Sequence, residues 1–267
     1  MTAYFQPWLG QIHAWLLVMF RLTGLFFVAP VFSSRLMPPQ VKVFMVVTLS
    51  FCVYPMLLTR SVGSPAVMHT MEHGLTLWML IPQIATELLI GAVLGYGASL
   101  PLMAMQVGGH VIDQQMGMGI AGVFNPELGA QTGVVGEFYY LLAVTLFVLM
   151  GGMQVMLITL AGTFEHIPLG GFYVDSQLIT LLLGMLNAMM SLALRIAAPL
   201  LCLIFLETVA MGFLMRTVPQ INVLSIGFPV RILIGVWVLV GTVAIVMDVF
   251  SEQMRMTLHR LGVFFGL

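Results

Sequence analysis

Charge is scarce in this sequence of 267 residues, and its scarcity excludes two classes of protein. Charged side chains make up 7% of the chain, whereas ordinary globular chains hold about 25%. A soluble domain with so few polar groups could not cover its own surface. The nine Lys and Arg residues also form no basic patch for a nucleic acid. We therefore expect neither a soluble domain nor a nucleic-acid-binding protein.

Cysteines and catalytic motifs are also nearly absent. Cys52 and Cys202 both lie in apolar runs, without the spacing of a disulfide framework or a metal site, and are typical of small core residues. The motifs HExxH, GxSxG and GxxxxGK[ST] do not occur. His69, Glu72 and His73 provide at most half of a metal site. We expect no enzymatic activity, no cofactor and no metal.

Hydrophobic residues, in contrast, make up 60% of the chain and lie in long runs. A transmembrane helix needs about 20 consecutive apolar residues. The sequence therefore predicts an all-α integral membrane protein, with about six hydrophobic helical segments arranged as kinked helices and hairpins. We expect one membrane-embedded domain over residues 1–267 and no soluble domain. The apolar runs are residues 8–32, 43–58, 75–107, 138–164, 176–215 and 223–249.

Two of these runs allow finer predictions. Gly91 and Gly95 place small residues one helical turn apart, which favours close packing against a second helix. Pro82 and Pro101 mark expected kinks in the same run. The run 176–215 would measure about 60 Å as one helix, twice the thickness of a bilayer core. It forms either two short spans in a hairpin or one bent helix that extends outside the lipid.

Basic residues do not reveal the membrane orientation. With six spans, the two sets of loops carry equal numbers of basic residues, so the positive-inside rule gives no answer. This failure indicates that the helices are not simple independent spans. One set holds Arg35, Lys42 and Arg216, and the other holds Arg60, Arg255 and Arg260.

Seven ionisable residues lie inside apolar segments, where each needs a partner. A charged side chain at the centre of a lipid bilayer costs about 2.5–3.5 kcal/mol on insertion scales. The residues form either a relay for protons or ions, as in a transporter, or a set of interhelical pairs that fixes the assembly. Both signs are scattered and no acidic motif is clustered, which favours pairs. They are Arg21, Glu87, Asp113, Glu137, Arg195, Glu207 and Asp248.

A segment rich in glycine and methionine, residues 107–136, separates two of the most apolar runs. Glycine is favoured where backbones approach closely or adopt positive φ. Methionine and phenylalanine provide soft or bulky apolar surface. A solvated connector needs neither, so we interpret the segment as a buried loop that forms an apolar seal by excluding water. The residues assigned to this seal are Met116, Gly117, Met118, Gly119, Ile120, Gly122, Val123, Phe124, Asn125 and Pro126.

Three stretches resemble the FliR family, whose members are export-gate subunits of the flagellar type III secretion apparatus. Residues 215–231 read MRTVPQINVLSIGFPVR, which resembles the signature of the family. Residues 20–42 are similar to its first span and proline-containing turn. Residues 115–143 are similar to its central loop, with Phe124-Asn125-Pro126 at its centre. The resemblance covers essentially the whole chain.

The resemblance implies a role in protein translocation at the bacterial inner membrane, in the flagellar basal body. It implies a hetero-oligomeric gate with FliP and FliQ, joined by FlhB and FlhA, through which unfolded flagellar proteins pass. It also implies that the central loop, here about residues 114–131, supplies a plug for the pore.

We expect residues 215–231 to have a structural role. Pro219 and Pro229 are expected to break helices, and Gln220 and Asn222 to satisfy the freed backbone groups. The residues assigned to assembly and structure are Arg21, Glu87, Arg195, Glu207, Pro219, Gln220, Asn222, Gly227, Pro229 and Arg231.

Two other functions compete with a flagellar gate subunit. A virulence-type injectisome homologue would share the fold and the mechanism but export effectors. A secondary transporter for a small solute would suit broken helices and charges inside the membrane. The halves of this chain show no inverted match, and its acidic residues do not cluster, which favours the gate.

Overall fold

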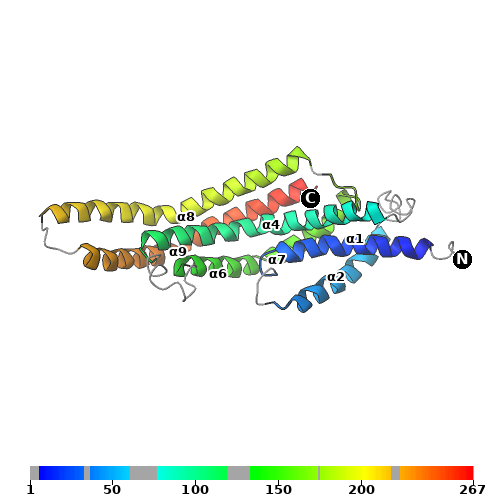
Figure 1. Ribbon diagram of the computed structural model, residues 1–267, viewed down its shortest axis with the longest axis horizontal. Coiled ribbons are helices and arrows are strands. Elements are labelled where there is room, and N and C mark those ends of the chain that lie inside the picture. The colour runs from blue at the N-terminus through cyan, green and yellow to red at the C-terminus, as the bar shows by residue number, and fades with distance from the viewer. Residues whose placement is uncertain are drawn as a thin grey trace. The chain divides into compact units, whose positions relative to one another are not determined.

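A computed structural model of the chain describes residues 6–32, 37–60, 77–118, 133–173, 175–217 and 223–266. Within these ranges every regular element is an α-helix (Figure 1). Five helices are long and apolar enough to cross a membrane, or six if α6 and α7 form one bent span. The predicted all-α membrane architecture is therefore confirmed. The helices are α1 (Gln6–Val28), α2 (Pro39–Arg60), α4 (Leu77–Gln115), α6 (Val134–Leu149), α7 (Gly152–His166), α8 (Ser176–Thr217) and α9 (Val223–Phe264).

Contacts group the described residues into two compact units. Helices α4, α8 and α9 each contribute residues to both units. Unit 1 is drawn from Met1–Ser99, Gly151–Leu183 and Met256–Leu267, and unit 2 from Leu100–Met150 and Gly184–Arg255.

Several helices continue through proline. The run 176–215 forms the single helix α8, which contains Pro199, so the hairpin alternative is wrong. Its 42 residues correspond to a length of about 63 Å. The predicted break at Pro229 is also wrong, because this residue lies inside α9. Proline is tolerated in membrane helices because neighbouring groups satisfy the carbonyl that loses its N–H partner.

The apolar run 138–164 forms two helices rather than one. Helix α6 ends at Leu149 and α7 begins at Gly152. Between them, Gly151 adopts a left-handed backbone conformation, with φ of 71°. Glycine adopts this conformation without steric cost, so an uninterrupted apolar sequence still breaks here.

The glycine-rich segment predicted over residues 107–136 is partly helical. Helix α4 continues to Gln115, and α6 begins at Val134. Gly108 and Gly109 therefore serve helix packing in unit 2 rather than a turn. A Cβ on Gly109 would lie 2.6 Å from the Cα of Gly136, and a Cβ on Gly108 would lie 3.0 Å from the carbonyl oxygen of Ala193.

Unit 1 is built on a close contact between α1 and α4. A Cβ on Gly91 would overlap the carbonyl oxygen of Arg21, and a Cβ on Gly24 would overlap that of Leu88. One turn further along, a Cβ on Gly95 would lie 2.8 Å from the amide nitrogen of Ala29. The predicted small-residue face of α4 is therefore confirmed. The core around this contact includes Leu17, Val18, Leu25, Ile90 and Leu94.

Helix α2 packs against α1 and runs in the opposite direction (Figure 1). The rings of Trp15 and Phe51 lie 5.0 Å apart between the two helices. The rest of α2 is mostly exposed within the chain, with Val43 at 63% and Phe44 at 71% of their accessible surface. Such an apolar face needs lipid or another subunit to cover it.

The α1–α4 contact predicts a position-specific effect of adding one methyl group. Gly91→Ala forces backbones apart, and overpacking of this kind costs about 1–3 kcal/mol or more. The matched control is Gly184→Ala on α8, where a Cβ would meet no atom within 4 Å. The control should leave the stability unchanged or raise it, since alanine is the better helix former. Thermal denaturation of the two variants in detergent measures the difference; equal midpoints would contradict the packing argument.

Candidate functional site

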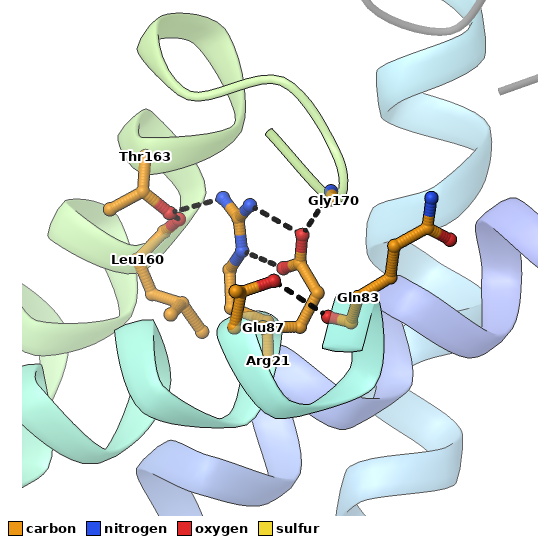
Figure 2. A network of polar contacts seen from close by, with 7 residues as sticks. Arg21, Gln83, Glu87, Leu160, Thr163 and Gly170 are labelled. Atoms are coloured by element: carbon orange, nitrogen blue, oxygen red, sulfur yellow. Dashed lines mark hydrogen bonds and ion pairs between the residues drawn. The ribbon is translucent and has the colours of Figure 1, made fainter. Parts of the chain in front are cut away.

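A buried ion pair joins α1 to α4 in unit 1. The side chains of Arg21 and Glu87 are both fully buried. Nε and Nη2 of Arg21 donate to the two carboxylate oxygens of Glu87, a two-point contact (Figure 2). Such a bidentate pair fixes both side chains in one geometry. Glu87 lies one helical turn before Gly91, so the close approach of the two backbones brings the charges together.

Further hydrogen bonds connect this pair to α7 and to the turn that follows it (Figure 2). Nη1 of Arg21 donates to Oγ1 of Thr163 at 2.9 Å, and the guanidinium carbon lies 4.3 Å from the centre of the Phe164 ring. The backbone N–H of Gly170 donates to Oε1 of Glu87 at 2.7 Å. The network therefore holds α1, α4, α7 and the turn at Gly170 together.

A second ion pair joins α8 to α9 in unit 2. Nε of Arg231 donates to Oε2 of Glu207 at 2.9 Å, and Nη2 of Arg231 donates to Oγ1 of Thr208 at 3.0 Å. Arg231 is 30% exposed, so this pair is less enclosed than the pair in unit 1. The sequence left open whether Glu207 pairs with Arg195. Arg195 is exposed on α8 and forms no ion pair with any residue that the structure describes.

Asp113 joins the end of α4 to the start of α6. Its side chain is buried, with 2% of its surface exposed. The backbone N–H groups of Val135 and Gly136 donate to its two carboxylate oxygens, at 3.1 and 3.0 Å. These bonds link the two sides of the segment between Met118 and Gly133.

Three residues of the predicted seal belong to the described part of the chain. Met116 is fully buried, and its side chain fills the space beside Gly235, where a Cβ would lie 2.5 Å from the Met116 Cε. Gly117 adopts φ of 80° beside the ring of Phe228, and Met118 follows it, partly exposed. The other residues of the seal lie outside the described residues: Gly119, Ile120, Gly122, Val123, Phe124, Asn125 and Pro126.

The residues assigned to assembly are placed as follows. Gly227 is buried in α9, and Pro229 and Arg231 lie in the same helix. Pro219, Gln220 and Asn222 lie outside the described residues.

Sequence reasoning named Asp113 among the charges that need a partner but did not find that partner, and it did not identify Thr163 and Gly170 as partners of the ion pair in unit 1. For Asp113, one signal was available. The residues before α6 read Gln-Thr-Gly, and the N-cap position is Gly133, which provides no side-chain cap. A helix start without its own cap needs an acceptor from elsewhere. For Thr163 and Gly170, no sequence pattern indicated that Arg21 and Glu87 would meet them.

Glu87, Asp113 and Glu207 each link two elements of the chain. No group of three or more His, Cys, Asp or Glu side chains within the described ranges is placed to hold a metal ion. His69, Glu72 and His73 lie outside these ranges. Each carboxylate described above is bonded to an arginine or to backbone N–H groups of the same chain.

Comparison with known proteins relates the chain to bacterial export. Residues 12–257 match the family model described as bacterial export proteins, family 1. The chain is 29% identical to the flagellar biosynthetic protein FliR of Bacillus subtilis, covering 94% of this chain and 96% of the relative. It is 27% identical to FliR of Escherichia coli, covering 86% and 84%. It is also 27% identical to the surface presentation of antigens protein SpaR of Shigella flexneri, covering 88% of both.

The two ion pairs predict unequal effects of the same substitution. Glu87→Gln leaves Arg21 charged, fully buried and unpaired, and breaking a buried pair costs about 3–5 kcal/mol. Glu207→Gln leaves Arg231 30% accessible to solvent, so the loss of this partly buried pair should cost less than the loss of the fully buried one. The double variant Arg21→Met, Glu87→Met removes both charges and should recover part of the loss. Thermal denaturation in detergent tests this order, and a larger effect at Glu207 would contradict it.

Proposed function

We propose that this chain, which belongs to family 1 of the bacterial export proteins, is a subunit of the flagellar type III export gate. In this proposal it assembles with FliP and FliQ, is joined by FlhB and FlhA, and lines a channel at the inner membrane. Unfolded flagellar proteins pass through this channel. The observation that carries the proposal is the family match over residues 12–257 in a chain built from long apolar helices.

The surface of the chain supports a role inside a larger assembly. Several long helices are apolar on the faces that no other described part of the chain covers. On α9, Leu233, Trp237 and Val240 expose 63%, 79% and 71% of their surface. Lipid covers part of such a surface, and unlike subunits would cover the rest.

Within this gate, we assign the apolar seal to the segment that begins at Met116. A channel for unfolded protein must exclude ions when idle, and an apolar constriction does so by excluding water. Met118, Ile120, Val123 and Phe124 provide the apolar side chains. Met116 serves as an anchor, because it is fully buried in unit 2.

A small-solute transporter is less well supported than a gate. A proton or ion relay needs carboxylates that are free to change partners. Glu87, Asp113 and Glu207 are instead held by hydrogen bonds within their own units.

An injectisome subunit is the second candidate, because a relative named for the surface presentation of antigens matches most of the chain. The flagellar assignment is preferred on the FNPELG and IGFPVR stretches. The two differ in the partners that they require, so the same experiment tests both.

The proposal predicts that the tagged chain co-purifies with unlike membrane subunits. Extraction in mild detergent, followed by mass spectrometry, should recover FliP and FliQ in the same particle. Injectisome subunits in their place would favour the second candidate. A stable monomer or homo-oligomer that catalyses uptake of a small solute would contradict the gate.

The seal predicts a leak without a loss of assembly. Residues 118–124 are replaced by a Ser/Gly sequence of the same length, and Met116 is kept because it is buried in unit 2. The idle gate should then conduct ions, since a polar constriction remains filled with water. Single-channel conductance of the purified complex in a planar bilayer measures the leak, and the yield of complex is the control. A variant that assembles and stays tight would contradict the seal.

A further inference from the structure

Arg195, on α8 in unit 2, carries a charge that the contacts within the chain leave unpaired. It is exposed, and no residue that the structure describes forms an ion pair or a side-chain hydrogen bond with it. It is also the only charged residue of α8 before Glu207. An arginine that faces lipid chains is costly, so an arginine in an apolar helix needs protein, water or another charged group beside it.

Arg195 belongs to a stripe of polar and small side chains along one side of α8. Its members follow one another at intervals of three or four positions, so they lie above one another on the helix surface. All are exposed, and large apolar side chains such as Met190 and Leu194 lie beside them, with 48% and 61% of their surface exposed. We call this set the α8 stripe: Asn187, Ser191, Arg195, Ala198 and Cys202.

The packing of α8 explains why the stripe faces away from the rest of unit 2. Ala193 and Ile196 are buried, and both contact α4 near Gly108. A Cβ on Gly108 would lie 3.0 Å from the carbonyl oxygen of Ala193 and 3.2 Å from the Cβ of Ile196. Each residue turns an α-helix by about 100°, which places the stripe roughly opposite this buried side. No part of α4 therefore covers it.

Lipid alone cannot cover the exposed apolar side chains of α8. They recur from Ile179 to Met215, which are 53% and 45% exposed. These residues are about 54 Å apart along the helix. The hydrocarbon core of a bilayer is about 30 Å thick, so a helix tilted by as much as about 40° keeps about 39 Å of its length inside the core. Part of this surface therefore needs another protein to cover it.

The composition of the α8 stripe indicates that it is a part covered by protein. Helix contacts in membranes are enriched in small residues and in Ser and Asn side chains that bond across helices, whereas lipid chains offer no such bonds. Arg195 in addition needs an anion, and a carboxylate fits the guanidinium group at two points. Arg21 and Arg231 are each paired with a glutamate across two helices of this chain. The complement of the stripe is therefore an apolar helix that carries an Asp or Glu.

We infer that the α8 stripe is an interface for an apolar helix of an unlike membrane subunit, and that an Asp or Glu of that helix pairs with Arg195. The inference rests on the proposed function, because that function supplies unlike membrane subunits. A lipid phosphate would account for Arg195 alone, and not for the polar side chain of Asn187 about 12 Å earlier on the same stripe.

The first test compares Arg195→Glu and Arg195→Lys with a control, Arg255→Glu. Arg255 is an exposed arginine of unit 2 that lies near Glu252 and Gln253 at the polar end of α9, so it undergoes the same change of charge outside the stripe. The measurement is the amount of unlike membrane subunits that co-purify with the tagged chain in mild detergent, relative to the amount of chain in the membrane.

Arg195→Glu should lower this recovery by about tenfold or more, because it replaces an attraction with a repulsion between buried like charges. Arg195→Lys should keep most of it, since the positive charge remains. Arg255→Glu should match the wild type. Equal recovery from Arg195→Glu and the wild type would overturn the inference, as would an equal loss from Arg255→Glu.

A second test identifies the occupant of the stripe. The photoreactive residue p-benzoylphenylalanine in place of Cys202 lies on the stripe two turns from Arg195. After irradiation of intact membranes, it should form an adduct with an apolar helix of an unlike subunit. Changing an acidic residue of that helix to Lys should restore the assembly of Arg195→Glu. An adduct with a second copy of the chain, or no adduct with any protein, as a lipid phosphate at Arg195 would give, overturns the inference.

A pair of variants at Ser191 keeps the result decisive if Arg195→Glu does not accumulate in the membrane. Ser191→Phe keeps the charge but fills the stripe, and should also lower recovery by about tenfold. Its control, Ser191→Ala, keeps a small side chain and should assemble normally. Normal assembly of Ser191→Phe would overturn the inference. If the wild-type chain itself recovers no unlike subunit, the proposed function fails; if it does and the variants at 191 and 195 assemble equally well, only the interface fails.

Discussion

The buried ion pair between Arg21 and Glu87 is the interaction on which unit 1 depends. Neither charge can remain alone in an apolar core, and each satisfies the other at two points. The pair also depends on its surroundings, because Thr163 and Gly170 complete the hydrogen bonds. It can form only where α1 and α4 approach closely, which Gly24, Gly91 and Gly95 permit.

Unit 2 solves the same problem with a different partner. Asp113 has N–H groups in place of an arginine, supplied by the first turn of α6. The requirement is the same in both units: a buried polar group needs an internal partner. In unit 1 the partner is a side chain that brings its own charge. For Asp113 in unit 2 the partners are the N–H groups in the first turn of a helix, which have no acceptor within that helix and lie at the positive end of its dipole.

The chain therefore has two kinds of region: helices fixed by buried polar contacts, and an apolar segment that follows Met116. The ion pairs and the Asp113 cap hold neighbouring helices together, and the polar side chains involved are bonded within the chain. The segment that follows Met116 has mostly apolar side chains. In the proposed gate this division is useful, because a seal against ions must be apolar to exclude water. Methionine and glycine are appropriate for an apolar seal, while charged residues are appropriate for the contacts that hold the helices together.

Much of the fold could be read from the pattern of apolar runs, because a membrane helix must satisfy its backbone within itself and its length follows from its composition. The number of long helices and the close packing at Gly91 and Gly95 were predictable in this way. The helix bounds were less so. Pro229 does not end α9, and glycine at 151 breaks an apolar run that has no charge. Local composition cannot decide such cases, since neighbouring helices determine which backbone groups are satisfied.

The sequence by itself determined that this chain is a helical membrane protein, that its charges need partners, and that one segment is unusually rich in glycine and methionine. Only the tertiary structure decided which charges meet. Glu207 pairs with Arg231, 24 positions away, rather than with the nearer Arg195, and Asp113 pairs with backbone N–H groups. The reason is physical: Coulomb attraction and hydrogen bonds act over a few ångströms of space, and helix packing sets those distances.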